Sequence, residues 1–443
     1  MGSVTSNMAQ YTCREIDPGA YDAFSAQHPQ GNFQQSTKMN DVRKQGGASI
    51  DYLGFFEEDQ LVAACALEIH HRRLSTFAEI HDGPLCDFTD AELTAFVFAE
   101  LKKRARSGGA AQLAITPELP YQYRDSDGNE LPSADDAAWP ANTPKGLPSE
   151  PNVEAFNNIV QCGFEHDGFD RDYTAVPRWR YVKDLTDCKN EQGLLATYAK
   201  NHKRNVRIAH NSCVKVERIG REQLNVFHDI CEMSSERQGF DNRPLEYFEL
   251  LFDCLGDSAE FYVAFIDAAA FLKSWEDKRD GFLAEVERLK KLEEKGPLST
   301  KNEKKLNDQQ SKYEASLKRV DKAREYLESD GERIPAAAAM FVFHPRECVY
   351  LFSGSNAKYA KFYAATAIQH HIMCECIERG LNRYNFYGIN GIFDDPDDPG
   401  RGLLEFKQGF GGYVEEMMGS FTMPVKPVTF AVKKLAHKIL DRS

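Results

Sequence analysis

Several features that define common protein classes are missing from this sequence. No stretch approaches the ~20 consecutive apolar residues of a membrane-spanning helix, and the mean hydropathy of −0.53 argues against an integral membrane protein. The first seventeen residues lack a basic segment followed by an apolar one, so we expect no signal peptide. The opening MGSVTS fits an N-myristoylation pattern, but that pattern is short and common.

Familiar catalytic and metal-binding signatures are also missing. There is no G-x-S-x-G, no H-E-x-x-H and no Walker or Rossmann glycine fingerprint. The eleven cysteines form no C-x-x-C pair, so we expect no metal site and free thiols in a reducing compartment. The string from Arg106 to Ala111 loosely matches a pyrophosphate loop of acetyl-CoA transferases, but it follows a helix instead of preceding one. We therefore interpret it as a helix cap.

Positive charge is in deficit over the whole chain. The 54 Lys and Arg residues face 68 Asp and Glu residues, for a net charge of −14. This balance argues against indiscriminate coating of nucleic acid but allows a local basic patch. An apolar fraction of 42% excludes a disordered chain, and 443 residues suffice for about three domains or one large two-domain body.

Residues 272–334 differ in composition from the rest. They carry 16 basic and 15 acidic residues, with apolar residues at heptad spacing on both sides of Gly296-Pro297. These apolar positions are Trp275, Phe282, Val286 and Leu289, then Tyr313, Leu317, Val320 and Leu327. We predict an antiparallel helical hairpin, a coiled-coil arm that projects from the body.

The tip of this arm is basic. Residues 288–305 hold seven basic and three acidic side chains, a net charge of +4, and include Lys290 and Lys291. This charge indicates contact with RNA or with anionic lipid, or simply a solvated charged hairpin.

Outside the arm, strands and helices alternate. The patterns predict two strands over 49–72, a helix over 90–110, a strand over 111–119 and a long loop over 121–152. A similar order then repeats, with helices over 194–212, 221–240, 245–256 and 360–380 and strands over 214–220, 259–270, 382–391 and a pair near 413–422. We predict an α/β (α+β) fold with two tandem copies of one module, the arm being inserted in the second.

The glycine-rich stretch 384–421 contains a lone cation between aromatic residues, Lys407 between Phe406 and Phe410. Its glycines let the backbone pass close to a ligand or to itself. The plain interpretation is a surface lysine on a hairpin whose phenylalanines are buried. The functional one is a partly desolvated lysine that stabilises developing negative charge.

Four motifs occur in one order along the chain. They are Phe33–Ser36 with Val42-Arg43, then Glu236–Phe240 with Arg243 and Tyr247-Phe248, then Ser353–Ser355 in a Gly-Ser turn after a strand, then Tyr387–Ile389 with Glu405–Gly412. Together they resemble the Fem family of aminoacyltransferases, which use aminoacyl-tRNA to build peptidoglycan cross-bridges. Met39 stands where that family usually has Trp, and Thr116-Pro117 where many members have Asp-Pro.

The resemblance implies two GNAT-like, acetyltransferase-type domains. The first, for precursor binding, would comprise 1–176 with 423–443. The second, with the catalytic-site lysine, would comprise 177–271 with 335–422, and 272–334 would be the arm. Family members that act on the lipid-linked precursor carry such an arm, so its presence favours lipid II over UDP-MurNAc-pentapeptide as acceptor.

The resemblance also implies the reaction. The amine of the stem peptide's third residue attacks the aminoacyl ester at the tRNA 3′ end, and because this ester is already activated we expect no cofactor. Lys407 matches the catalytic-site lysine, for oxyanion or 3′-end contact, with Phe406 beside it in the substrate site. Arg243 and Tyr247 match residues that hold the precursor's diphosphate and sugar. Arg43 stands where the family usually has Lys.

Less specific signals add further candidates. Tyr121 and Asp125 are the nearest alternatives for lining the acceptor site, unless they serve turn chemistry. Lys203, Arg204 and Arg207 share a helix face with Lys200, which suits tRNA phosphates or a solvated surface. The last nineteen residues predict a basic amphipathic helix that packs on the body or contacts the inner membrane leaflet.

We therefore expect a monomeric cytoplasmic enzyme, free or peripheral at the inner face of the plasma membrane. Its partners would be aminoacyl-tRNA and a peptidoglycan precursor. Two alternatives are a non-enzymatic coiled-coil scaffold on a degenerate body and a CoA-dependent N-acyltransferase. The missing phosphate loop speaks against the second.

Overall fold

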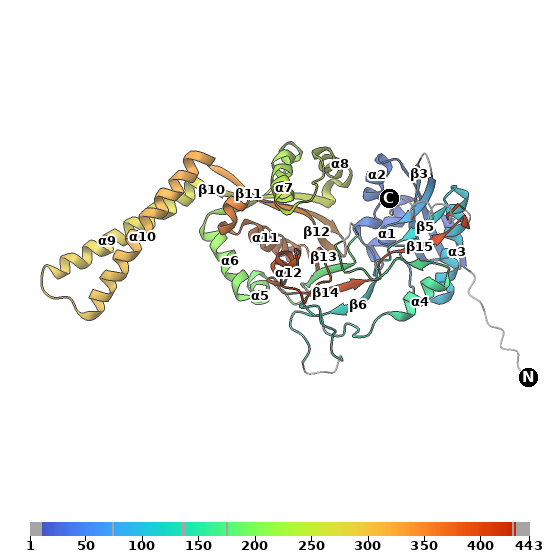
Figure 1. Cartoon of the computed structure of the whole chain (residues 1–443), viewed down its shortest axis with the longest axis horizontal. Helices are drawn as coiled ribbons and strands as arrows, with labels where there is room; N and C mark the ends of the chain where they lie inside the picture. The colour runs from blue at the N-terminus through green and yellow to red at the C-terminus, as the bar shows by residue number, and fades with distance from the viewer. Residues whose placement is uncertain (1–10, 73–74, 134–137, 174–175, 428, 431–443) are drawn as a thin grey trace, which may run out of the picture.

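A computed structural model describes residues 11–72, 75–133, 138–173, 176–427 and 429–430 (Figure 1). Two mixed β-sheets with covering helices form an elongated body, and a helical hairpin projects from one end. The predicted α/β class with two modules is confirmed. None of the helices in the described ranges combines the length and apolarity that a bilayer span requires. The myristoylation pattern and most of the predicted C-terminal helix lie outside those ranges.

The first sheet has seven strands in the order β1-β2-β3-β4-β5-β15-β7. Their bounds are Tyr11–Glu15, Ala48–Glu57, Gln60–Arg72, Ser75–Ile80, Gln112–Ile115, Phe421–Pro424 and Glu165–His166. Its helices are α1 (Pro18–Gln27), α2 (Thr37–Gln45), α3 (Ala91–Ser107) and α4 (Val153–Gln161). The hairpin predicted over 49–72 is confirmed as β2 and β3, and α3 buries its apolar face in the core of this module.

The second sheet has eight strands in the order β6-β14-β8-β13-β12-β11-β10-β9. Their bounds are Pro120–Arg124, Tyr413–Met417, Trp179–Asp184, Arg383–Ile389, Glu347–Ser355, Arg333–His344, Ala259–Asp267 and Val214–Ile219. Its helices are α5 (Glu191–Ala196), α6 (Lys200–Asn211), α7 (Leu224–Gln238), α8 (Leu245–Leu255), α11 (Ala364–Glu378) and α12 (Arg401–Gln408). One core contains residues of α11 and α12, and another contains residues of α7 and α8.

The two sheets exchange strands. Strand β6 lies in the stretch predicted to be a loop, yet it pairs with β14 in the second sheet. Strand β15 pairs with β5 and β7 in the first sheet. The prediction of a strand pair near 413–422 was therefore wrong, because β14 and β15 belong to different sheets. The domain boundaries stay a prediction.

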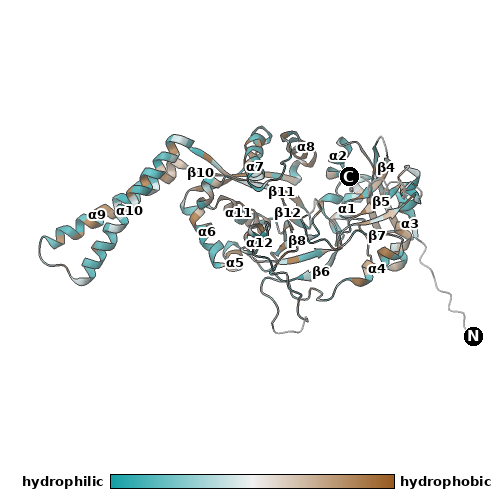
Figure 2. Cartoon of the chain, in the orientation of Figure 1, coloured by the Kyte–Doolittle hydropathy of each residue, from teal (hydrophilic) through white to brown (hydrophobic). Residues whose placement is uncertain are grey.

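The arm consists of α9 (Ala268–Glu293) and α10 (Thr300–Asp330), inserted between β10 and β11. At 1.5 Å per residue, the 26 residues of α9 extend ~39 Å, and most residues of the arm are hydrophilic (Figure 2). At its base, Phe271 and Tyr326 pack on Phe362, with ring centroids 5.2 and 5.8 Å away. The arm is therefore anchored in the core of the second module.

The contact seam of the arm differs from the predicted heptad in its second helix. Val286, Leu289 and Val320 are buried as expected, but Leu317 is 39% exposed and the neighbouring Ser316 is buried instead. Ala323 is also buried. Small residues at the seam let the helices approach closely, so the larger Leu317 lies at its edge.

Candidate functional site

Lys407 is buried in the second module at the end of α12. The predicted surface hairpin was wrong, because the motif is helical and Lys407 is only 3% exposed. Its Nζ donates to the carbonyl oxygens of Gly388 at 2.5 Å and of Tyr387 at 3.5 Å. Burial lowers the pKa of Lys407 from 10.5 to about 7. An amine balanced near neutrality acquires its charge readily when negative charge develops beside it.

The carbonyls that receive Lys407 come from an irregular point of β13. The pairing of β13 with β8 shifts register between Asn385 and Gly388, and Tyr387 has a left-handed φ of +61°. The Asn385 side chain accepts a hydrogen bond from the Tyr387 backbone N–H at 2.8 Å. A tyrosine rarely adopts this conformation, which costs about 1–3 kcal/mol and persists only where the surroundings hold the residue in place.

A buried charge cluster lies beside the Tyr387 ring. The Arg180 guanidinium is 5.4 Å from the ring centroid and contacts Glu118 at 2.5 Å and Asp82 at 3.2 Å. Burial raises the pKa of Glu118 to about 8, although Arg180 opposes the shift. Thr116, predicted to replace a carboxylate, accepts from the Asp82 N–H at 2.8 Å.

Sequence reasoning missed this cluster, which supplies two carboxylates close to the position where Thr116 stands. The available signal was Arg180, a charged residue between Trp179 and Tyr181 in strand β8.

The glycines that follow Lys407 serve close packing of the chain on itself. A Cβ on Gly409 would lie 1.9 Å from the His202 ring of α6, and one on Gly412 would lie 2.3 Å from the Val182 carbonyl oxygen. Phe406 also faces His202, with ring centroids 6.0 Å apart. These glycines therefore join α12 to α6 and β8.

Reasoning from the sequence also missed a second buried lysine, Lys183. Its Nζ donates to Thr197 Oγ1 at 2.7 Å and to the carbonyls of Phe410 and Gly411 at 2.9 and 3.1 Å. Burial lowers its pKa to about 8. Lys183 thus holds the turn that follows α12.

The predicted basic face of α6 lies close to the C-terminal end of α12. The Ala199 N–H, just before α6, donates to the Gly409 carbonyl at 2.9 Å. Lys203, Arg204 and Arg207 are exposed on α6, and Lys203 donates a hydrogen bond to the Ala196 carbonyl at 3.0 Å. Within the described ranges neither arginine has an ion-pair partner. A solvated cationic surface therefore lies next to the segment that holds Lys407.

Arg243 and Tyr247 lie on the face of the second sheet opposite α11 and α12, and Arg43 of α2 is nearby. Arg243 is exposed before α8, lies 5.4 Å from the Tyr247 ring centroid, and has no ion pair among the described residues. Tyr247 packs against the apolar cluster that contains Phe33 and Tyr387. Arg43 lies near Tyr247, where its charge and that of Arg243 oppose the burial that raises the Tyr247 pKa.

The remaining predicted residues lie apart. The Tyr121 ring packs on Phe156 and Phe169 at 5.9 and 5.0 Å. The Asp125 carboxylate accepts from the backbone N–H groups of Asp127 and Asn129 at 2.9 and 2.8 Å, as a turn residue does. Lys290 and Lys291 are exposed near the end of α9, at the arm tip.

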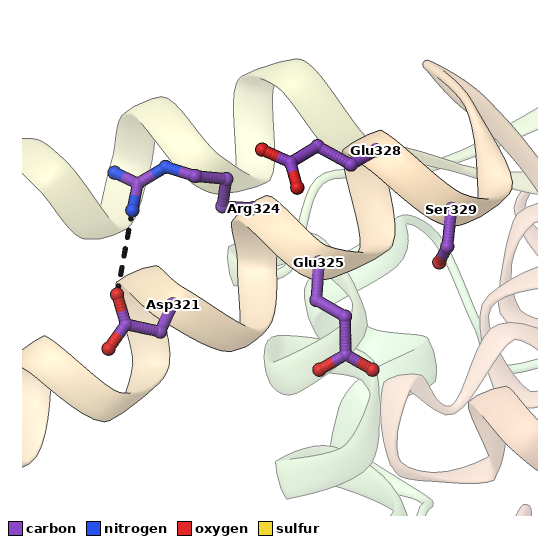
Figure 3. A pocket seen from close by; sticks show the side chains of 5 residues that line it. All are labelled: Asp321, Arg324, Glu325, Glu328 and Ser329. Atoms are coloured by element: carbon purple, nitrogen blue, oxygen red, sulfur yellow. Dashed lines mark hydrogen bonds and ion pairs between the residues drawn. The ribbon is translucent and has the colours of Figure 1, made fainter.

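A surface hollow of about 410 Å³ lies on the arm near its base (Figure 3). Its lining is Asp321, Arg324, Glu325, Glu328 and Ser329, with Arg324 held by Asp321 at 3.5 Å. This acidic lining does not suit a polyanionic ligand. The geometry therefore leaves Lys407 and its surroundings as the candidate site.

The sequence is also matched by a family profile. The FemAB family matches residues 16–438, nearly the whole chain. The chain belongs to the FemAB family. This FemAB protein is 26% identical over 427 residues to aminoacyltransferase FemA of Staphylococcus aureus strains RF122 and N315, covering 95% of this chain and 97% of FemA. Its fold matches the crystal structure of FemX with a TM-score of 0.75 at 22% identity, covering 95% of this chain and 99% of FemX.

Proposed function

We propose that this FemAB-family protein is a tRNA-dependent aminoacyltransferase. It transfers an amino acid from aminoacyl-tRNA to the side-chain amine of the third residue of a peptidoglycan stem peptide, with the lipid-linked precursor as preferred acceptor. The observation that carries the proposal is Lys407, a buried lysine with no carboxylate partner in the described structure, on the motif that resembles the catalytic-site motif of the family. The curated relative's name, aminoacyltransferase FemA, supports the same reaction class.

In the proposed reaction, the acceptor amine attacks the ester carbonyl carbon and the carbonyl oxygen becomes an oxyanion. Protonated Lys407 donates a hydrogen bond to this oxyanion, and burial strengthens the interaction. The intermediate collapses as the C–O bond to the ribose breaks, and the amine proton passes to the departing ribose oxygen, which leaves as a hydroxyl. An amide bond replaces the ester, so the step needs no redox partner or nucleotide.

The surrounding charges fit two anionic substrates. The face of α6 with Lys203, Arg204 and Arg207 suits the phosphates near the tRNA 3′ end. Arg243, exposed and unpaired in the described structure, suits the precursor's diphosphate, with Tyr247 beside its sugar. The basic arm tip with Lys290 and Lys291 suits contact with tRNA or with the inner membrane leaflet. A monomer acting at that leaflet from the cytoplasm meets both substrates.

Mass spectrometry of the products tests this function. The protein is incubated with total charged tRNA and either the lipid-linked disaccharide-pentapeptide or UDP-MurNAc-pentapeptide. A mass gain of one or more amino-acid residues is expected, mainly on the lipid-linked acceptor. Lys407→Ala should lower the transfer rate by ~10²–10³-fold, while Lys215→Ala, a surface lysine paired with Asp267, should not change it.

Other outcomes identify the alternatives. Acetylation from acetyl-CoA would point to a CoA-dependent enzyme. No transfer by folded protein to either acceptor would favour the scaffold protein, and an unchanged rate in Lys407→Ala would refute the role given to this lysine.

A further inference from the structure

We propose that Arg43 is a positioning residue, which acts on Lys407 through Gln34 and Tyr387, and is not a ligand of the precursor's phosphates. The inference rests on the proposed role of Lys407. It concerns two pairs of residues that are far apart in the sequence, one pair from each module. Arg43 and Gln34 lie beside the first sheet, while Tyr387 and Lys407 belong to the second.

Every nitrogen of the Arg43 guanidinium is already engaged. Nε contacts the Glu68 carboxylate at 3.1 Å. Nη1 donates to the Gln34 carbonyl at 2.6 Å and to Asn40 Oδ1 at 2.7 Å, and Nη2 donates to Gln34 Oε1 at 2.6 Å. The side chain is 9% exposed and that of Glu68 1%. Turning Arg43 towards a phosphate would leave Glu68 buried without its arginine.

The partner that Arg43 holds most firmly is Gln34, through both its backbone and its side chain. The Gln34 side chain in turn lies beside the Tyr387 hydroxyl, where it opposes the burial that raises the pKa of Tyr387. The preceding residue, Phe33, meets the Tyr387 ring edge-on, with centroids 6.4 Å apart. Arg43 therefore holds the short helical turn Phe33–Gln35 in place, and this turn of the first module packs against the Tyr387 side chain.

The backbone conformation of Tyr387 orients the two carbonyl oxygens that accept hydrogen bonds from Lys407. Its left-handed φ of +61° places its own carbonyl and that of Gly388 on the Lys407 amine. Such a conformation persists only where the surroundings hold the residue. The clamp of Gln34, Phe33 and Arg180 on the ring, with Asn385 on the N–H, supplies these constraints.

By contrast, Arg243 in the same region has the features expected of an arginine that binds an anion. It is exposed, and its one described contact is with the Tyr247 ring. The two arginines are therefore assigned different tasks. Arg243 receives the diphosphate, and Arg43 keeps the carbonyl pair of Tyr387 and Gly388 in place for Lys407.

The test separates a positioning role from phosphate binding in the full-length protein. Transfer kinetics give kcat and the KM for the lipid-linked acceptor. Protein labelled with 13Cε-lysine gives the titration of Lys407, assigned by the signal that Lys407→Met removes. Lys44→Gln is the matched control, because Lys44 follows Arg43 on the same helix but forms its ion pair with Asp41 at the surface and lies over the Tyr52 ring, away from Tyr387.

For Arg43→Gln we expect kcat to fall ~10–100-fold, because a displacement of about 1 Å has an effect of this size. The KM should change less than about twofold. The Lys407 titration should move up from about 7, since a loosened clamp admits water. Tyr387→Phe, which keeps the ring but loses the hydroxyl, should move both quantities in the same direction by a smaller amount.

A higher KM with an unshifted Lys407 titration in Arg43→Gln would overturn the inference and make Arg43 a substrate ligand. If the single variant does not fold, Arg43→Gln/Glu68→Gln serves instead, because it leaves no unpaired buried carboxylate. The titration needs no activity, so it still tests the clamp if the transferase proposal fails. Full activity of Lys407→Ala would refute that proposal alone.

Discussion

At the residue scale, this protein buries two lysine amines on backbone carbonyls. Lys407 bonds Gly388 and Tyr387, and Lys183 bonds Phe410 and Gly411. Carbonyl oxygens satisfy the N–H groups but do not neutralise the charge, so burial lowers both pKa values. The backbone carbonyls between Tyr387 and Gly411 thereby bind two lysine amines whose pKa values lie close to neutral pH.

The burial of Lys407 predicts a pH-dependent stability cost. Below pH 7 the amine is charged in both folded and unfolded chains, and the folded state carries the full desolvation penalty. Between about pH 7 and 10.5 the folded chain binds fewer protons than the unfolded one, so this penalty fades as pH rises. Lys407→Met should therefore stabilise the protein by a few kcal/mol at neutral pH and by less near pH 10.

Urea denaturation at several pH values measures this difference. Lys318→Met, an exposed residue of α10, serves as control and should stay within about 0.5 kcal/mol of the parent protein. A Lys407→Met variant that is less stable at neutral pH would show that the amine's hydrogen bonds outweigh its desolvation.

At the element scale, α12 and the arm differ in how they join the body. Helix α12 is short and lies over the second sheet, where Gly409 permits contact with α6. The arm is long, is anchored at its base by Phe271 and Tyr326, and ends in a basic tip away from both sheets (Figure 1). Its tip is thus free to contact a partner without disturbing the site.

A shortened arm tests the tip. Glu285 and Lys305 face each other across the hairpin at 2.6 Å, so residues 286–304 can be replaced by a short turn between them. This change removes Lys290 and Lys291 but keeps the anchored base. We expect at least ~10-fold weaker association at low salt with tRNA or with anionic vesicles, and a smaller salt dependence. Fluorescence anisotropy and vesicle sedimentation measure the two separately.

Unchanged binding to both tRNA and vesicles would show that the tip serves another partner. Replacement of Glu276 and Arg324 by Gln, which removes a pair nearer the base, provides a control for general damage to the arm.

At the scale of the whole molecule, the exchanged strands bind the two modules into one structure. Strand β6 precedes the second module in sequence but borders its sheet, and β15 follows that module but completes the first sheet. Arg180 adds a buried ion-pair link, since it stands on β8 and contacts Asp82 beyond β4 at 3.2 Å. Neither module is a closed unit along the chain.

We therefore predict that both modules unfold in a single transition. Differential scanning calorimetry of the full chain should show one main endotherm, and tryptophan fluorescence should report the same midpoint as circular dichroism. Fragments 1–176 and 177–443, made separately, should not fold. Two well-resolved endotherms would contradict this view of the strand exchange.

Much of this architecture could be predicted from local patterns. The α/β class follows from the alternating periods of strands and helices, and the hairpin 272–334 from its composition and from Gly296-Pro297. Lys407 was singled out because its motif is short and contiguous. The register within α10 was not predictable in this way, since Ser316 and Leu317 compete for one seam and packing against α9 selects the smaller residue.

The sequence by itself thus determined the fold class, the family and the residue types of the site, because these depend on neighbours along the chain. The tertiary structure decided the pairing of β6 and β15, the left-handed Tyr387, the ion pairs of Arg180 and the commitment of Arg43 to Gln34 and Glu68. These features join residues that are far apart in sequence or depend on such neighbours, as with Arg180 and Glu118, which are 62 positions apart. Burial then decides whether a charge is paired, shifted or left free, and burial exists only once the chain has folded.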